Sequence, residues 1–528
     1  MTGPRVMYYH DGRHPLIYMY EPPMQKEEYE QAVDELVGTP VEALMFCLGD
    51  GRTVLHDTKV GELWGTINEK WDHIIFRRAH QNAKHFIEEG NDPLRIVCDR
   101  ARAKGIKIYP TLLVQQGSGE FGVDMRTSSF RLDNKHLEIG ARGDLDPTAP
   151  GLDCLDFKHE EVRQERFELI EETLKNYDID GFELQMNYLP YYFHPDGVEA
   201  GRDIMTAWIR RVYEAVKDSG SQRELAIRIP NSIEDCLAKG MDLREWIGQG
   251  IVDVLIAEEL GDVGGTIIQS ADFRPMVEAA RNAPCRIQAV VHSQVDSDRL
   301  FDASIEIVRA AATNYWSQGI DGLYLAHWFV YWPYEDSFYG KLREVADPEI
   351  MAPKDKCYFV PTAGRLPEAP PVKADVMRRL PVELEVGKPV TVQFPISDDL
   401  ERWKDVDRVH QVLLRARITG TTEIDQFGFK LNGETLPEVL LRKINRMYMM
   451  RAPRYRISGY WFVFKLDRDH WPVRGENALE VTLNHKDLVA LPEVILRDVE
   501  LEIKYLMGKN YHRSFVDPDL GPFEGAVT

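Results

Sequence analysis

The sequence predicts an α/β fold, a (β/α)8 TIM barrel followed by a C-terminal β-sandwich. Over residues 1–350, short apolar runs alternate with amphipathic segments of helical spacing, such as 160–176. Eight of the runs are predicted strands: 5–11, 41–49, 106–114, 180–187, 224–230, 252–258, 285–293 and 321–330. Eight strands, each followed by a helix, is the number that a (β/α)8 barrel requires.

Repeated junctions between helices and strands support this prediction. The segments "KGIKIY" (104–109), "QGIVDVLI" (249–256) and "QGIDGLYL" (318–325) each place Gly and then Ile between a helix and a strand. Glycine suits the left-handed residue that ends a helix, and the Ile begins the next buried strand. The repetition indicates one unit used several times.

The pattern changes after the predicted barrel domain, 1–350. Residues 351–375 are rich in proline and are predicted to be a linker. Residues 376–508 alternate apolar and polar positions between turn residues, which predicts a jelly-roll-like β-sandwich. Residues 509–528 are predicted to be a C-terminal tail.

Composition narrows the function. The chain has 528 residues, too many for one ordinary domain, and 44% hydrophobic with 28% charged residues is typical of soluble globular proteins. The formal net charge of −22 argues against nucleic acid or an anionic membrane surface as the partner. No run approaches the ~18 apolar residues that span a bilayer. The sequence does not decide the oligomeric state, and a homo-oligomer is one of the alternatives.

Cysteine usage and the N-terminus predict a cytoplasmic protein. The six cysteines are scattered without a CxxC pair, which argues against a zinc site or a disulfide framework. The start "MTGPRVMYYHDG" lacks a charged region followed by an apolar run, so no signal peptide is expected. A chain from which a leader had been trimmed would show the same start.

The candidate site residues come from the ends of the predicted strands, because (β/α)8 enzymes carry their sites there. The polar and aromatic residues at or just after these ends are His10, Asp11, Asp50, Glu183, Gln185, Asn187, Tyr188, Arg228, Glu258, Glu259, His292, His327, Trp328 and Trp332. Sugars present C–H faces that stack on aromatic rings and hydroxyls that need such polar partners. The inventory predicts a carbohydrate substrate.

One strand carries three of these residues at every second position. Glu183, Gln185 and Asn187 alternate with apolar residues, so they share one face, which we expect to line the barrel. Glycoside cleavage commonly needs two carboxyl groups, one protonated and one ionised. Glu183 with either Glu258 or Glu259 is the best pair by position.

Each assignment has a structural alternative. Glu183 could be a buried carboxylate paired with Arg228, and Trp328 could belong to the barrel core. Glu258 and Glu259 are adjacent, so only one is expected to point inward. A metal held by Asp11 and the histidines His10, His292 and His327 is the less favoured alternative, and we expect no cofactor.

Several stretches resemble a known family. They are "LDFKHEEVRQERFELIEETLKNYDIDGFEL" (155–184), "RIPNSIEDCLAKGMDLREWIGQGIVDVLI" (228–256), "RAAATNYWSQGIDGLYLAHW" (309–328) and "VGELWG" (60–65). Together they resemble the glycosyl hydrolase-like family 10 group of bacterial (β/α)8 proteins, over most of residues 1–345. The C-terminal strands resemble the galactose-binding-type or jelly-roll domain appended to such barrels.

The resemblance fails at one position that matters for chemistry. Relatives commonly read "DGIELDF" on the fourth strand, which would place an Asp where this chain has Gln185. Chitinase-like barrels read "DGxDxDxE", which aligns loosely with Glu183, Gln185 and Asn187, and only the first carboxylate is kept here. Gln cannot serve as a nucleophile or general base.

The sequence therefore predicts a glycoside hydrolase of short oligosaccharides. Because the Asp of the relatives is missing, three alternatives follow for the mechanism. Glu183 works with Glu258 or Glu259, a group of the substrate replaces the nucleophile, or the protein binds sugar without cleaving it. Gln185, Asn187, Arg228 and His292 would bind hydroxyls or a substrate anion, with Trp328 as a stacking platform. A metal-dependent sugar isomerase or lyase is the remaining alternative.

Overall fold

The computed structural model describes residues 3–117, 119, 121–259, 266–295, 302–331, 334–362, 380–445, 459–506, 516–517 and 521–522. The chain divides into two compact units. The first, the barrel unit, comprises Met1–Glu259, Phe273–Val290 and Gly319–Tyr334. The second, the sandwich unit, comprises Leu260–Asp272, Val291–Gln318 and Glu335–Thr528. Of the predicted site residues, Trp332 lies outside the described residues, as does most of the predicted linker and tail.

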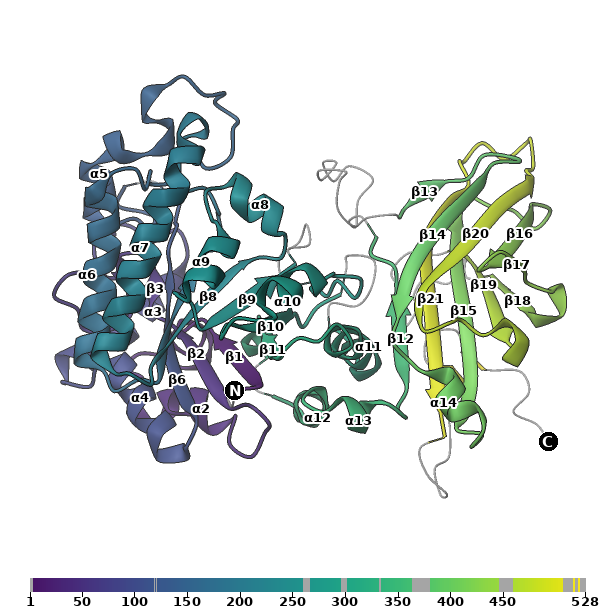
Figure 1. Ribbon diagram of the computed structural model, residues 1–528, viewed down its shortest axis with the longest axis horizontal. Coiled ribbons are helices and arrows are strands. Elements are labelled where there is room, and N and C mark those ends of the chain that lie inside the picture. The colour runs from purple at the N-terminus through teal and green to yellow at the C-terminus, as the bar shows by residue number, and fades with distance from the viewer. Residues whose placement is uncertain are drawn as a thin grey trace. The chain divides into compact units, whose positions relative to one another are not determined.

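Eight strands close into a barrel, which confirms the predicted fold class (Figure 1). Around the barrel the order is β1, β11, β10, β9, β8, β7, β6, β2. Pairing is parallel from β10 through β9, β8, β7, β6 and β2 to β1, and between β1 and β11. Their bounds are β1 Val6–His10, β2 Ala43–Cys47, β6 Lys107–Leu113, β7 Gly181–Gln185, β8 Glu224–Pro230, β9 Val254–Glu258, β10 Arg286–Val291 and β11 Gly322–Leu325.

Helices connect these strands along the chain. In the barrel unit they include α3 (Ile74–Glu88), α4 (Pro93–Lys104), α6 (Glu160–Asn176), α7 (Val198–Ser219), α8 (Ile233–Ala238), α9 (Leu243–Gln249) and α10 (Arg274–Ala280). Gly105 and Gly250 end α4 and α9 with φ of 72° and 65°, so the predicted left-handed glycine caps are confirmed. Among the described residues, no helix is long and apolar enough to cross a membrane.

Charged side chains lie at the N-terminal end of the barrel strands. Arg286 and Glu224 begin their strands and form an ion pair of 2.7 Å, and the Tyr109 hydroxyl donates to Glu224 at 2.6 Å. Arg286 also donates to the carbonyl of Pro4 at 3.2 Å. These contacts leave the opposite end of the strands, where the polar residues gather, as the candidate site.

The sandwich unit contains two antiparallel sheets, as the period-two alternation predicts (Figure 1). One sheet has the order β12 (Lys356–Phe359), β21 (Ile495–Tyr505), β15 (Val409–Thr419), β19 (Tyr460–Leu466), β18 (Leu441–Asn445), with β13 (Val382–Glu383) paired to β21. The other has the order β14 (Pro389–Ile396), β20 (Gly475–His485), β16 (Gln426–Leu431), β17 (Glu434–Thr435).

Alternate residues of these strands form the sandwich core. Phe394, Leu414, Leu479 and Leu501 come from four strands and belong to one buried cluster. Burying such side chains is worth about 1.5–3 kcal/mol each. The unit also contains the helices α11 (Ile305–Trp316), α12 (Asp336–Val345), α13 (Pro348–Met351) and α14 (Leu400–Lys404).

Candidate active site

A hydrogen bond that crosses the barrel defines the centre of the site. Glu183 on β7 and Tyr324 on β11 lie on directly opposite strands of the closed order. The Tyr324 hydroxyl is 3.1 and 3.0 Å from the two carboxylate oxygens of Glu183 and donates to them. Because opposite strands can meet only through the interior, both side chains point into the barrel.

A buried ion pair lies beside this hydrogen bond. Arg228 on β8 donates to both carboxylate oxygens of Glu258 on β9, at 2.8 Å from Nε and 3.0 Å from Nη2. Its Nη1 lies 3.4 Å from the Tyr324 hydroxyl. The guanidinium also lies over the rings of Tyr9 and Tyr324, with centroid distances of 5.1 and 4.9 Å. Arg228 therefore links the two carboxyl groups through Tyr324.

The three polar residues of the β7 segment all point inward. Beside Glu183, Gln185 donates from Nε2 to the Thr111 hydroxyl at 2.7 Å, and the Asn187 amide donates to Glu258. All three are buried. Their shared face is thus the interior face, and their roles toward a substrate stay predictions.

Burial gives Glu183 an unusual electrostatic state. The side chain has no exposed surface, and this desolvation raises the pKa of Glu183 to about 7. Arg228 and the Tyr324 hydrogen bond lower that pKa, whereas the charge of Glu258 raises it. Burial is the largest of these effects, so the carboxyl of Glu183 titrates close to neutral pH.

Asp50 and Asp11 belong to a separate ion-pair group. Arg13 Nη1 lies 2.7 Å from Asp50, whose same oxygen accepts from Trp64 Nε1 at 2.8 Å. Asp11 lies 3.7 Å from Arg13 Nε and accepts from the backbone N–H of His14 at 2.9 Å. Both carboxylates thus shape the turn after β1, an explanation that the sequence did not indicate.

His10 is held inside the same turn. Its Nδ1 accepts from the backbone N–H of Gly12 at 3.0 Å, and its ring stacks on Phe46 with centroids 5.4 Å apart. Burial lowers the pKa of His10 to about 4. The imidazole is therefore neutral at physiological pH.

The remaining predicted residues have varied surroundings. Glu259 accepts from the Asn231 amide at 3.2 Å, and burial raises its pKa. Tyr188 is 49% exposed, whereas Trp328 is 1% exposed, so the Trp328 ring is covered in this structure. His292 is buried, and His327 has a left-handed φ of 60° with its ring 6.3 Å from that of Tyr9.

Three residues of the cluster escaped the sequence reasoning, which considered strand ends only. Tyr324, Tyr9 and Thr111 all lie within strands. All four residues of Gly322–Leu325 are buried, so the sequence of this strand carries no alternation that would have identified Tyr324.

Among the described residues, one group of side chains approaches closely enough to share a metal ion. Asp144, His194 and Asp196 offer ligand atoms within 4.8 Å of one another. Arg142 lies 4.0 and 3.9 Å from the two carboxylates, so a protein cation already serves them. The alternative metal site of His10, Asp11, His292 and His327 does not form such a group in the described part of the chain.

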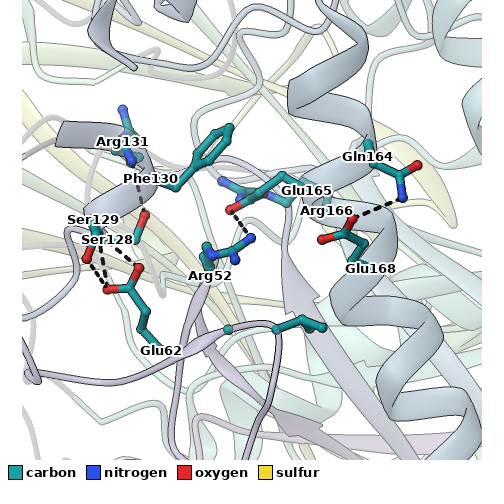
Figure 2. A network of polar contacts seen from close by, with 12 residues as sticks. Arg52, Glu62, Ser128, Ser129, Phe130, Arg131, Gln164, Glu165, Arg166 and Glu168 are labelled. Atoms are coloured by element: carbon teal, nitrogen blue, oxygen red, sulfur yellow. Dashed lines mark hydrogen bonds and ion pairs between the residues drawn. The ribbon is translucent and has the colours of Figure 1, made fainter. Parts of the chain in front are cut away.

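Charged side chains also hold the segment that follows β6. Arg131 and Arg166 both donate to backbone carbonyls within 114–116. Glu165 contacts Arg166 and lies 3.8 Å from Arg52 Nη1 (Figure 2). Burial and the neighbouring Arg166 lower the pKa of Arg131. This network fixes the backbone at the C-terminal end of β6.

No family model matches the chain, and no curated protein matches it. Among solved structures, similar ones include a Paenibacillus sp. cycloisomaltooligosaccharide glucanotransferase, with 11% identity, a TM-score of 0.34, and coverage of 94% of this chain and 57% of that one.

Two further similar structures are glycoside hydrolases. The α-L-fucosidase isoenzyme 2 of Paenibacillus thiaminolyticus has 11% identity and a TM-score of 0.41, covering 66% of this chain and 50% of that one. The PgaB (BpsB) glycoside hydrolase domain of Bordetella bronchiseptica has 11% identity and a TM-score of 0.39, covering 65% and 98%. This chain thus spans little more than half of the glucanotransferase and half of the fucosidase.

Proposed function

We propose that the barrel unit is a glycoside hydrolase in which Glu183 is the general acid and Glu258 the ionised partner carboxylate. The observation that carries this proposal is the contrast between two carboxyl groups of one barrel. Burial raises the pKa of Glu183 to about 7, whereas Arg228 pairs with Glu258 through two hydrogen bonds. Two carboxyl groups whose environments differ in this way suit acid and base roles.

Glycosidic bond cleavage uses such a pair directly. Glu183 would give its proton to the leaving-group oxygen, and Glu258 would stabilise positive charge or activate water at the anomeric carbon. Asn187, which donates to Glu258, would keep that carboxylate oriented. Glu258 is linked to Glu183 through Arg228 and Tyr324, whereas Glu259 accepts from Asn231, so Glu258 is the favoured partner.

Gln185 limits the mechanism. It donates to Thr111 inside the barrel and has no acidic group, so the two-carboxylate arrangement of the relatives is not used. The sequence resemblance to the glycosyl hydrolase-like family 10 group supports a carbohydrate substrate. Because Gln185 cannot serve as the second acid, Glu258 on β9 is proposed for that role.

A sugar-binding barrel without hydrolysis is the second candidate. The observation that favours it is that both oxygens of Glu258 accept hydrogen bonds from Arg228, and one also accepts from Asn187. Such strongly bound carboxylates are weaker bases and nucleophiles. The two candidates differ in whether the Glu183 proton is needed for turnover.

Substitution of Glu183 by Gln tests the proposal. We screen the full chain against neutral aryl glycosides and oligosaccharides, and then measure kcat and KM of wild type and E183Q on an oligosaccharide, because its alcohol leaving group needs protonation. General acid catalysis is worth about 10²–10⁴-fold, so E183Q should lose about that factor in kcat with little change in KM.

Glu224→Gln is the matched control, because Glu224 is also a barrel carboxylate but lies at the other end of the strands. It should retain kcat. Equal turnover of E183Q and wild type would contradict the proposal, and binding without turnover by the wild type would establish the sugar-binding candidate.

A further inference from the structure

The side-chain amide of Asn187, just beyond β7, is hydrogen-bonded on one side only. Its Nδ2 donates to the carboxylate of Glu258. The side chain is 5% exposed, and its Oδ1 is buried without a hydrogen-bond donor among the described residues. Leaving a buried acceptor unpaired destabilises a folded protein, so an unpaired acceptor in a candidate site indicates where a ligand can donate.

Glu258 determines which way this amide points. Glu258 is the proposed ionised carboxylate of the site and pairs with Arg228 through two hydrogen bonds. An ionised carboxylate only accepts hydrogen bonds, so it faces the NH2 group of Asn187 and not the oxygen. Exchanging the two amide atoms would set two acceptors against each other. The unpaired Oδ1 is therefore an acceptor held beside the proposed partner carboxylate.

The backbone is held on both sides of Asn187. Before it, the Met186 N–H donates to the Arg228 carbonyl at 2.7 Å, and the Met186 carbonyl accepts from the Tyr192 hydroxyl at 3.3 Å. After it, Leu189 has a left-handed φ of 45°, a conformation that L side chains rarely adopt. Such a residue persists where the surrounding structure requires its conformation, and ligand sites are common places for it. The Asn187 oxygen is therefore fixed in position by its own segment.

The chemistry of a glycoside limits which group can donate to this oxygen. Under the proposed function Glu258 acts at the anomeric carbon, so the neighbouring Asn187 Oδ1 lies next to the groups bonded to that carbon. These groups are the ring oxygen, the glycosidic oxygen and C2. Neither oxygen carries hydrogen, so only a substituent on C2 can donate. A hydroxyl and an acetamido group both can, whereas a 2-deoxy sugar has only C–H bonds there.

We propose that Asn187 Oδ1 accepts a hydrogen bond from a donor group on C2 of the sugar whose bond is cleaved, so that Asn187 selects against 2-deoxy sugars. The inference rests on the proposed hydrolase function and names its substrate class, glycosides with a hydroxyl or an acetamido group on C2. The next residue, Tyr188, is 49% exposed, so this segment reaches the surface from which a sugar approaches. A sugar without the donor leaves Oδ1 unpaired, and sites built around such a hydrogen bond reject the analogue that lacks it.

Glycosides that differ only at C2 test the inference on the full chain. The probes are nitrophenyl glucosides and galactosides with a hydroxyl, an acetamido group or only hydrogen on C2, in both anomeric forms. We measure kcat/KM and compare the ratio of each parent to its 2-deoxy analogue, because the intrinsic reactivity of a glycoside cancels between wild type and variant. This ratio should fall about tenfold or more in Asn187→Ala, which removes the acceptor. The larger of the hydroxyl and acetamido ratios identifies the donor group.

Asn82→Ala is the matched control, because Asn82 is also a buried asparagine of the barrel unit, but its amide bonds to backbone groups of Leu16, Tyr20 and Met24. It should keep the wild-type ratio. Calorimetry with the methyl glycosides gives the binding ratio of the wild type, which depends on no variant and should favour the parent sugar.

Two results separate this inference from the hydrolase proposal. An unchanged ratio in Asn187→Ala, or equal binding of parent and 2-deoxy sugars by the wild type, would overturn the role of Asn187 and leave the result for Glu183→Gln as it stands. If no glycoside of the set is cleaved or bound, both proposals fail.

Discussion

Two buried clusters, one in each unit, hold charged groups in different ratios. Inside the barrel, Glu183 and Glu258 share one guanidinium, that of Arg228. In the sandwich unit, Asp398 has Lys356 as its own cation and accepts from two tyrosines as well. Matched buried charges serve packing and orientation, whereas an unmatched carboxyl costs free energy in the folded state unless it is protonated. In the barrel this cost falls on Glu183, the residue that we propose as the general acid.

The largest expected effect tests the matched pair. Lys356→Met leaves Asp398 buried without its cation, and breaking such a pair costs about 3–5 kcal/mol of unfolding free energy. Urea unfolding measures the change. Lys354→Met is the control, because its pair with Glu344 is partly exposed and should contribute below about 1 kcal/mol. Equal losses for the two variants would remove the distinction between matched burial and surface pairing.

Substitution of Glu183 should raise the unfolding free energy, whereas Lys356→Met should lower it. The pKa of Glu183 is raised to about 7 in the folded state, so the folded protein binds more protons than the unfolded chain between pH 4.5 and 7. The stability that protonated Glu183 contributes at low pH is therefore lost as the pH rises through that window. Glu183→Gln removes the ionisable group and should raise the unfolding free energy by about 3 kcal/mol at pH 8 and by little at pH 4.

Glu224→Gln is the comparison for this variant. Glu224 is paired with Arg286, so its substitution by the neutral Gln should lower the unfolding free energy of the protein. The measurement is the unfolding free energy of both variants at pH 4 and pH 8. A loss of stability in E183Q at pH 8 would mean that the Glu183 charge is compensated in the folded state, contrary to the contrast between the two buried clusters.

A smaller effect is expected at Tyr324. Its hydroxyl donates to Glu183 and lowers the pKa of that carboxyl. Tyr324→Phe should therefore raise the pKa of Glu183 and move the alkaline limb of the pH–rate profile to higher pH, with a stability loss of about 1 kcal/mol. Tyr9→Phe keeps a ring facing the same guanidinium and should leave the limb in place. A shift to lower pH in Tyr324→Phe would contradict the hydrogen-bond assignment.

The fold could be predicted from local patterns, whereas the site could be predicted only in part. Strand runs and the Gly105 and Gly250 caps follow from periodicity and backbone preference, which neighbouring residues determine. The pairing of Arg228 with Glu258 depends on how adjacent strands align, and that of Glu183 with Tyr324 on barrel closure across 141 residues. Asp50 was predicted from its strand-end position, yet its partners Arg13 and Trp64 become neighbours only in the folded loops.

The protonation state of Glu183 decides whether this carboxyl can act as the proposed general acid. Infrared difference spectra between wild type and E183Q, recorded from pH 4 to pH 9, isolate the carboxyl band of this one residue. We expect a protonated carboxyl at pH 5 that ionises near pH 7, because burial raises its pKa. A Glu183 band that is already that of a carboxylate at pH 5.5 would contradict the proposed role, because Glu183 could then not donate a proton at neutral pH.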